Sequence, residues 1–312
     1  MDIKRVIRIL SDPKGIFVKL NYNYPLLFSW MPDEMNLKFW YRYNFGKKLN
    51  LDNPETFNEK LQWLKLNNRK DEYTRMVDKY EVKEYVASIV GDQFIIPTLG
   101  VWDSFDEIDF DALPEQFVLK CTHDSGGLVI CKDKSKLDLK VAKKKIQKSL
   151  KRSYYWVGRE WPYKNVKPRI IAEAYMQDSK TNDLKEYKND LTDYKFFCFN
   201  GDPKYCQVIG DRSVSETMDF FDMNWKIQPF TKRTLSGAEF LHSMNLEKPK
   251  HFDEMVCIAK KLAGTMPFSR IDLYEINDKV YFGEITFFPN SGLFNRFSPD
   301  EWDLKLGKMI AL

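Results

Sequence analysis

The stretch RIDLYEINDKVYFGEITFFP, residues 270–289, predicts a β-hairpin that carries charged side chains among apolar ones. Its two apolar runs flank Asn277-Asp278, a pair typical of a tight turn. Arg270 and Asp272 lie two residues apart on the first strand, so they face the same side. Folding about the turn brings Glu284 near Asp272, and the two carboxylates repel each other unless a cation lies between them. Hard oxygen ligands of this kind suit Mg²⁺, and the alternative is two exposed carboxylates at the mouth of a hairpin.

A second stretch, FVLKCTHDSGGLVICKD, residues 117–133, predicts two antiparallel strands joined by a polar loop. A Walker loop needs GxxxxGK[ST] between a strand and a helix, so this stretch is not one. Gly126 and Gly127 would still let backbone N–H groups approach phosphate oxygens, with Lys120 adding positive charge at the strand end. Taken alone, the stretch is more typical of an ordinary turn.

The rest of the chain predicts helices first and mostly antiparallel strands later. Thr56 and Glu59 form a capping-box pattern before an apolar helix, and residues 74–91 predict one helix that ends at Gly91. A hairpin with Asn200-Gly201 at its turn is expected over residues 193–211. This mixture predicts the α+β class. Further strands are expected within 92–102, 168–176 and 218–230, and a further helix within 252–266.

The composition is that of a globular protein: 312 residues, 43% hydrophobic and 30% charged. The net charge of +4 is too balanced to indicate nucleic-acid binding. The lysine-rich run at 140–152 predicts an amphipathic helix, either simply solvated or facing an anionic polymer or membrane.

Cysteine usage and the first residues point to the cytoplasm. The five cysteines include no CxxC pair, which favours free thiols. The start, MDIKRVIRILSDPKG, lacks the apolar core of a signal peptide. The apolar piece YPLLFSWM, residues 24–31, is too short to span a bilayer, and a contact with a membrane surface or a partner stays open for it.

The order of these pieces resembles the ATP-grasp superfamily: a strand-end lysine, a glycine-rich hairpin, an acidic strand residue, an RxD strand and a final glutamate. The stretch at 270–289 resembles the core of D-alanine–D-alanine ligase-like enzymes. The wider chain, over roughly residues 30–312, resembles the TupA-like branch found in bacterial polysaccharide gene clusters. The segments that carry this resemblance are PETFNEKLQWLKL, VDKYEVKEYV, FVLKCTHDSGG, DYKFFCFNGDPKYC and FGEITFFPNSGL.

The resemblance implies an ATP-grasp fold, in which two α+β subdomains grip ATP, with a helical N-terminal extension. The implied parts are the extension (1–75), the N-terminal subdomain (76–116), the lid with the glycine hairpin (117–190) and the catalytic, metal-binding subdomain (191–312).

The resemblance also implies roles for single residues. Arg270 and Lys195 would stabilise the transferred phosphoryl group, while Asp272 and Glu284 would hold Mg²⁺. The common ending E-x-N is here Glu284-Ile285-Thr286, so Asn290 in the next loop is expected either to replace the missing amide ligand or to bind substrate. The residues expected to contact ATP are Lys79, Lys120, Ser125, Gly126, Gly127 and Lys195 at the phosphates, with Glu173, Ala174, Tyr175 and Met176 at the adenine.

The implied function is an ATP-dependent carboxylate–amine ligase that works through an acyl phosphate. The family context suggests a uronic acid or an amino acid as carboxylate and an amino acid or amino sugar as amine, free or sugar-linked, in surface polysaccharide synthesis at the inner face of the membrane. His123 in the glycine loop either approaches the acyl phosphate or packs the loop. The alternatives are a kinase-like phosphotransferase and a glycosyltransferase or assembly protein of the same pathway. No oligomeric state is indicated.

Overall fold

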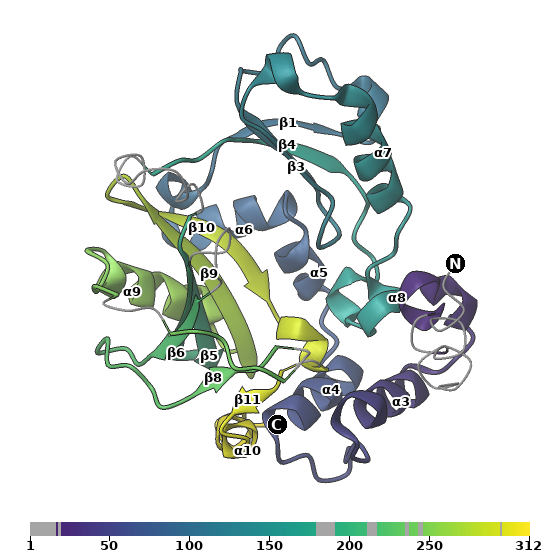
Figure 1. Cartoon of the computed structure of the whole chain (residues 1–312), viewed down its shortest axis with the longest axis vertical. Helices are drawn as coiled ribbons and strands as arrows, with labels where there is room; N and C mark the ends of the chain where they lie inside the picture. The colour runs from purple at the N-terminus through teal and green to yellow at the C-terminus, as the bar shows by residue number, and fades with distance from the viewer. Residues whose placement is uncertain are drawn as a thin grey trace.

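The computed structural model confirms the α+β class and places its two larger antiparallel sheets one above the other, with helices between and around them (Figure 1). A third sheet consists only of the short strands β8 (Thr231–Lys232) and β11 (Phe297–Ser298). None of the helices in the described ranges is long and apolar enough to cross a membrane. The structure describes residues 17, 20–178, 191–210, 217–234, 237–242, 246–293 and 295–312.

The smaller sheet has four strands in the order β1-β4-β2-β3. The predicted pairing of the two strands around the glycine loop is confirmed, with Phe117 opposite Cys131 and Lys120 opposite Leu128. Helix α7 (Leu139–Leu150) covers this sheet and buries Ile146 against it. The strands are β1 (Thr98–Trp102), β2 (Phe117–Cys121), β3 (Leu128–Cys131) and β4 (Ile170–Ala174).

The larger sheet has five strands in the order β10-β9-β5-β6-β7, and helix α9 (Phe252–Ala263) packs on it. Both predicted hairpin turns are confirmed. Asn200-Gly201 have φ angles of 50° and 85°, and Asn277-Asp278 have 50° and 59°, the left-handed backbone that tight hairpin turns require. The strands are β5 (Asp193–Phe199), β6 (Asp202–Gly210), β7 (Thr217–Phe221), β9 (Phe268–Ile276) and β10 (Lys279–Thr286).

A bulge in β10 decides which way Glu284 points. Counted from the two-residue turn, a regular ladder would put Gly283 opposite Asp272 and turn Glu284 to the other face. The register instead shifts after Phe282, so that Glu284 lies opposite Asp272. A Cβ at position 283 would lie 3.0 Å from the Asp272 carbonyl oxygen and 2.9 Å from the Tyr274 ring. Glycine therefore permits the shift that brings the two carboxylates to one face.

The helices before the first sheet differ from the prediction in one place. The prediction of a single helix over 74–91 is wrong, because one helix ends before Asp78 and a second helix begins at Glu81. Asp78 has an extended backbone, and its Oδ1 accepts the N–H groups of Tyr80 (2.8 Å) and Glu81 (3.1 Å). Aspartate competes in this way with helical hydrogen bonds and starts a new helix. The helices are α3 (Asp33–Phe45), α4 (Phe57–Asn67), α5 (Glu72–Val77), α6 (Glu81–Val90), α8 (Tyr155–Gly158) and α10 (Glu301–Lys308).

Helix α4 begins at the predicted capping box of Thr56 and Glu59 and belongs to the core of the larger sheet. Phe57 is fully buried, with its ring centroid 4.9 Å from that of Phe268 and 5.7 Å from that of Phe297. Part of the expected N-terminal extension therefore packs into the main core. The short elements are η1 (Pro25–Phe28), η2 (Asp92–Phe94), η3 (Phe105–Glu107), η4 (Lys134–Lys136), η5 (Trp161–Tyr163), η7 (Pro289–Gly292), β8 (Thr231–Lys232) and β11 (Phe297–Ser298).

We expect Phe57→Ala to lower the free energy of unfolding by about 3–5 kcal/mol, because it leaves a cavity among four aromatic rings. Chemical denaturation followed by circular dichroism measures this. Trp30→Ala is the control, since that side chain is 71% exposed and its loss should change stability by no more than about 0.5 kcal/mol. A loss below about 1 kcal/mol for Phe57→Ala would show that α4 is not part of the main core.

Candidate active site

A cavity of about 230 Å³ lies between the two sheets and takes residues from both. The smaller sheet and its glycine loop supply Lys120, Glu173 and Ser125, and the larger sheet supplies Glu284. One part of the wall is apolar, and the other part is charged. The apolar part includes Val82, Ile95, Ile96, Phe282 and Ile285.

The charged part of this cavity is lined by Lys79, Lys83 and Lys120, and the last two form ion pairs with one carboxylate. Lys83 and Lys120 each place Nζ 2.5 Å from a different oxygen of Glu173, which is 5% exposed. Burial by itself raises the pKa of Glu173, but the two ammonium groups hold it below its usual value. The prediction missed Lys83, whose place at the cavity depends on contacts between segments far apart in the chain.

The glycine loop is anchored on both sides and open at its tip. The backbone carbonyl of Asp124 accepts a hydrogen bond from Lys79, and its carboxylate accepts one from Ser149. The N–H of Cys121 donates to the Gly127 carbonyl at 2.8 Å, which closes the strand pair. Gly126 has a φ of 123°, which side chains rarely adopt, and open space where a Cβ would be. Ser125 and Gly126 are therefore the exposed tip, and its movement as a lid stays a prediction.

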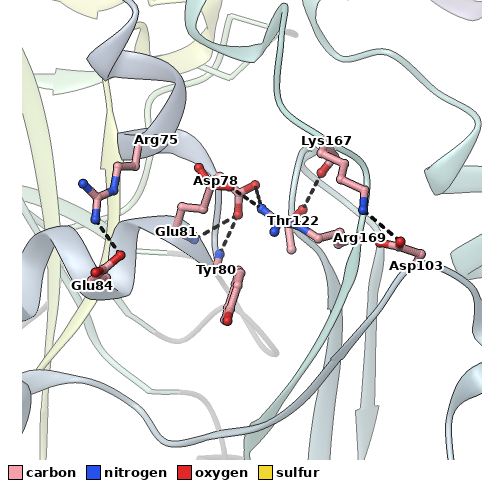
Figure 2. A network of polar contacts seen from close by, with 9 residues as sticks. All are labelled: Arg75, Asp78, Tyr80, Glu81, Glu84, Asp103, Thr122, Lys167 and Arg169. Atoms are coloured by element: carbon pink, nitrogen blue, oxygen red, sulfur yellow. Dashed lines mark hydrogen bonds and ion pairs between the residues drawn. The ribbon is translucent and has the colours of Figure 1, made fainter.

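Arg169 ties the link between α5 and α6 to the smaller sheet (Figure 2). Its guanidinium donates to Asp78 at 2.8 Å and to Glu81 at 2.7 Å. The backbone continues the connection, since Thr122 N–H donates to the Arg169 carbonyl at 2.9 Å and Lys79 N–H donates to the Thr122 carbonyl at 3.1 Å. These contacts fix the position of the Lys79 backbone at the edge of the cavity.

On the larger sheet, Arg270 lies between the two predicted carboxylates. Its Nε donates to Asp272 Oδ1 at 2.6 Å and its Nη2 to Asp272 Oδ2 and Glu284 Oε1 at 2.7 Å each. Nη2 also donates to the Thr286 hydroxyl at 3.0 Å, and Lys195, opposite Asp272 on β5, donates to Asp272 Oδ2. Burial raises the pKa of Asp272, but Arg270 and Lys195 outweigh it and keep this carboxyl ionised. The cation expected between the carboxylates is thus a guanidinium in this structure.

The oxygen atoms gathered here fit Mg²⁺ by their chemistry. Asp272, Glu284 and Thr286 are hard donors around one point, and Mg²⁺ in nucleotide sites commonly takes one or two carboxylates and completes its shell with phosphates and water. The described residues hold no cluster of three or more histidine, cysteine or acidic side chains that would bind a metal without such help. Glu284 faces the cavity with its side chain 48% exposed, while both oxygens of Asp272 are held by cations. Metal binding would therefore require Arg270 to give up part of its contacts.

Not all of the predicted site residues meet at this cavity. Glu173 and Glu284 line it, but Ala174, Tyr175 and Met176 are not among its lining residues. Arg270, Asp272 and Lys195 do not line it either and reach it only through the contact of Arg270 with Glu284. Asn290 lies in η7, donates to Asn295 at 3.1 Å and lines a different cavity, so the structure does not bring it to the carboxylates. Thr286, instead of Asn290, joins the side chains that contact Arg270. The adenine hinge and the third metal ligand stay predictions.

His123 is 3% exposed, and its Nε2 lies 3.0 Å from the Arg152 carbonyl oxygen. Of the two roles considered for it, these contacts favour packing the loop against the end of α7.

The chain matches a model of the TupA-like ATPgrasp family over residues 59–311. Among solved structures, D-alanine–D-alanine ligases from Bacillus anthracis and Helicobacter pylori each share 15% identity, covering 82% of this chain and 69% of their own, with a TM-score of 0.41. An L-amino acid ligase from Bacillus licheniformis shares 11% identity, covering 85% of this chain and 57% of its own, with a TM-score of 0.45. No curated protein sequence matches the chain.

Lys232 on β8 is a buried amine close to the charged cluster. It is 4% exposed, with Nζ 5.4 Å from the centre of the Phe197 ring and 5.9 Å from that of Phe297. Burial, together with the positive charges of Arg270 and Lys195, lowers the pKa of Lys232 to about 7 from 10.5.

This pKa predicts a pH-dependent stability. Between pH 7 and 10.5 the unfolded chain holds a proton on Lys232 that the folded chain lacks, so the free energy of unfolding rises with pH. We expect wild type to gain about 2 kcal/mol relative to Lys232→Met between pH 7 and pH 9. Urea denaturation of both proteins at the two pH values measures the difference. An equal pH dependence in the two proteins would mean that Lys232 stays protonated in the fold.

Proposed function

Because this chain belongs to the TupA-like ATP-grasp family, we propose that it is an ATP-dependent ligase that joins a carboxylate to an amine. The observation that carries this proposal is the cavity in which Lys120 of the smaller sheet, with Lys79 and Lys83 beside it, shares a wall with Glu284 of the larger sheet, which Arg270 joins to Asp272. Such a site neutralises and positions a triphosphate, which is most of what phosphoryl transfer needs from a protein. The apolar wall around Ile95 and Phe282 suits a flat base.

The proposed reaction has two steps. A carboxylate oxygen of the first substrate attacks the γ-phosphorus of ATP, ADP leaves, and an acyl phosphate forms. The amine nitrogen of the second substrate then attacks the acyl carbon, inorganic phosphate leaves, and the nitrogen gives up a proton as the amide forms. Water must stay away from the acyl phosphate in between, because hydrolysis would waste ATP.

Each charged residue has a proposed part in this chemistry. Lys79 and Lys120 hold the phosphates, while Glu173 fixes Lys120 and Lys83 in place. Arg270 stabilises the negative charge on the transferred phosphoryl group, with Lys195 beside it. Mg²⁺, held by Asp272 and Glu284 together with the phosphates, would supply further charge neutralisation. Ser125 and Gly126 close over the phosphates, since they form the exposed tip of the loop.

A long groove next to the glycine loop supports an acidic carboxylate substrate. Its volume is about 700 Å³, and it shares Asp124, Ser125 and Gly126 with the cavity between the two sheets, which we call the nucleotide cavity. The end of α7 supplies a row of cations, and the facing wall is aromatic and apolar, a combination that suits an acidic sugar such as a uronic acid, free or linked to a carrier. With the family context, this favours a role in bacterial surface polysaccharide synthesis in the cytoplasm. The cations are Lys145, Lys148 and Lys151, and the aromatic and apolar residues are Tyr24, Leu26 and Leu27.

The purified protein with ATP and Mg²⁺ tests the proposal. It is offered uronic acids, amino acids and nucleotide-linked uronic acids, each with hydroxylamine, an uncharged nucleophile that turns an acyl phosphate into a hydroxamate. Carboxylate-dependent hydroxamate and ADP are expected. A stable phosphorylated product seen by ³¹P NMR, unchanged by hydroxylamine, would indicate the kinase-like alternative. No ADP release with any carboxylate would reject the ligase.

We expect Glu284→Gln to lower kcat for carboxylate-dependent ADP release by at least about 100-fold, because it removes a charge that faces the phosphates. Thermal unfolding should show that the variant is folded. Glu301→Gln is the control, since it alters only an exposed pair with Lys305 and should keep full turnover. Undiminished turnover in Glu284→Gln would reject the metal assignment.

A further inference from the structure

A second cavity of about 200 Å³ lies next to the nucleotide cavity and has opposite charges in its wall. Glu160 supplies the negative charge and Arg152 the positive one. Tyr22, Trp40 and Tyr154 supply aromatic surface. The volume is below the roughly 300–1,000 Å³ that is common for drug-sized ligands, so a small molecule fits it best.

The second cavity adjoins the reacting end of the nucleotide cavity. Tyr163 lines the nucleotide cavity and Tyr154 lines the second one, and their ring centroids are 4.8 Å apart, edge to face. Arg270 and Glu284 are close enough to Glu160 for their charges to influence its pKa, Arg270 lowering it and Glu284 raising it. Ser125 at the tip of the glycine loop lines both cavities and the groove. A molecule in the second cavity therefore lies beside the place where the phosphoryl group is transferred.

Glu160 is a buried carboxylate with no ion pair among the described residues. It is 4% exposed and forms a hydrogen bond with Ser291. Lys65 is close enough to attract it, but directs its amine to neutral oxygens, the carbonyls of Gly158 and Ser291 at 2.7 Å each and the Ser291 hydroxyl at 3.0 Å. Burial raises the pKa of Glu160, which reflects the cost of a charge without a contacting cation. A cationic group of a ligand would remove that cost.

Arg152 offers the complementary charge on the same cavity. Within the described ranges its guanidinium has no carboxylate partner and lies 5.2 Å from the centre of the Tyr22 ring. The cavity thus presents a carboxylate and a guanidinium, the pair that binds a zwitterion. An amino sugar has the ammonium but no carboxylate for Arg152.

We propose that the second cavity binds an amino acid as the amine substrate, with its ammonium group at Glu160 and its carboxylate at Arg152. This assignment rests on the proposed ligase function and selects an amino acid over an amino sugar. Glu160 holds the ammonium group on the side of Arg270 and Glu284, where the acyl phosphate forms. The ammonium group gives up one proton before its nitrogen attacks the acyl carbon, and a second proton leaves as the amide forms. Tyr22, Trp40 and Tyr154 cover the aliphatic part of the amino acid.

The test distinguishes binding of the amine substrate from formation of the acyl phosphate, which is the first half of the reaction. Wild type, Glu160→Gln, Arg152→Met and Lys144→Met are assayed with the carboxylate accepted in the hydroxylamine assay. The amines are the common amino acids, their α-carboxamides and glucosamine. Lys144 is exposed on the same helix as Lys145 and lines none of the three cavities, so Lys144→Met is the matched control for loss of one positive charge.

We expect wild type to form amides with at least one amino acid and not with glucosamine. Glu160→Gln should raise KM for that amino acid at least about 10-fold, while hydroxamate formation stays within about 3-fold, because hydroxylamine carries no ammonium. Arg152→Met should raise KM for the amino acid but not for its α-carboxamide. Lys144→Met should match wild type in every assay.

In the kinetic assays, the assignment is overturned by an unchanged amino-acid KM in Glu160→Gln, by an equal loss of hydroxamate and amide formation in that variant, or by use of glucosamine as well as amino acids. Calorimetric titration of each amino acid into protein with ADP and Mg²⁺ gives a reading that needs no turnover. If wild type binds an amino acid and Glu160→Gln does not, this supports the assignment of the second cavity even when no ligase activity is found. If hydroxamate forms but no amino acid binds, the proposed ligase function is supported and the assignment of the second cavity is rejected.

Discussion

The buried ion pair between Arg270 and Asp272 is the constraint on which the rest of the structure depends. Asp272 is 1% exposed, and a charge in that position is tolerated only when cations satisfy both of its oxygens. Arg270 on the same strand and Lys195 on β5 do so, and this requires β5 and β9 to pair in one register. Glu284 joins the same group only because β10 bulges at Gly283. One electrostatic requirement thus aligns three strands and places Glu284 in the wall of the cavity.

The opposite wall balances its charges in a different way. Glu173 holds Lys83 and Lys120 together, and Lys79 is fixed by the backbone that Arg169 secures. Lys79, Lys83 and Lys120 line the cavity together with Glu173, and the larger sheet contributes Glu284 to the lining. This arrangement keeps the ligand-free protein stable and still offers a polyanion several partners at once.

Much of this architecture follows from local sequence. Turn pairs such as Asn277-Asp278, the capping box at Thr56 and the glycine loop each have a physical signature within a few residues, so the hairpins, helix α4 and the α+β class could be predicted. The break at Asp78 was missed because the apolar periodicity continues through it, and only the side-chain hydrogen bonds reveal it. The partners of Arg270 and the place of Glu160 could not be predicted, since they depend on contacts between segments far apart in the chain. Asn290 shows the same limit: its place in sequence suggested a ligand, but the turn at η7 directs it to another cavity.

The match to the family begins at residue 59, yet Tyr22 and Trp40 line the second cavity and Tyr24 and Leu26 line the groove. The wall around the second cavity and the groove is therefore composite: Tyr22, Tyr24, Leu26 and Trp40 come from outside the matched stretch, and Arg152, Tyr154 and Glu160 come from within it. The described residues that line the nucleotide cavity begin only at Met76. Substitutions in the N-terminal wall would therefore reshape both neighbouring spaces without disturbing the charge balance at Arg270.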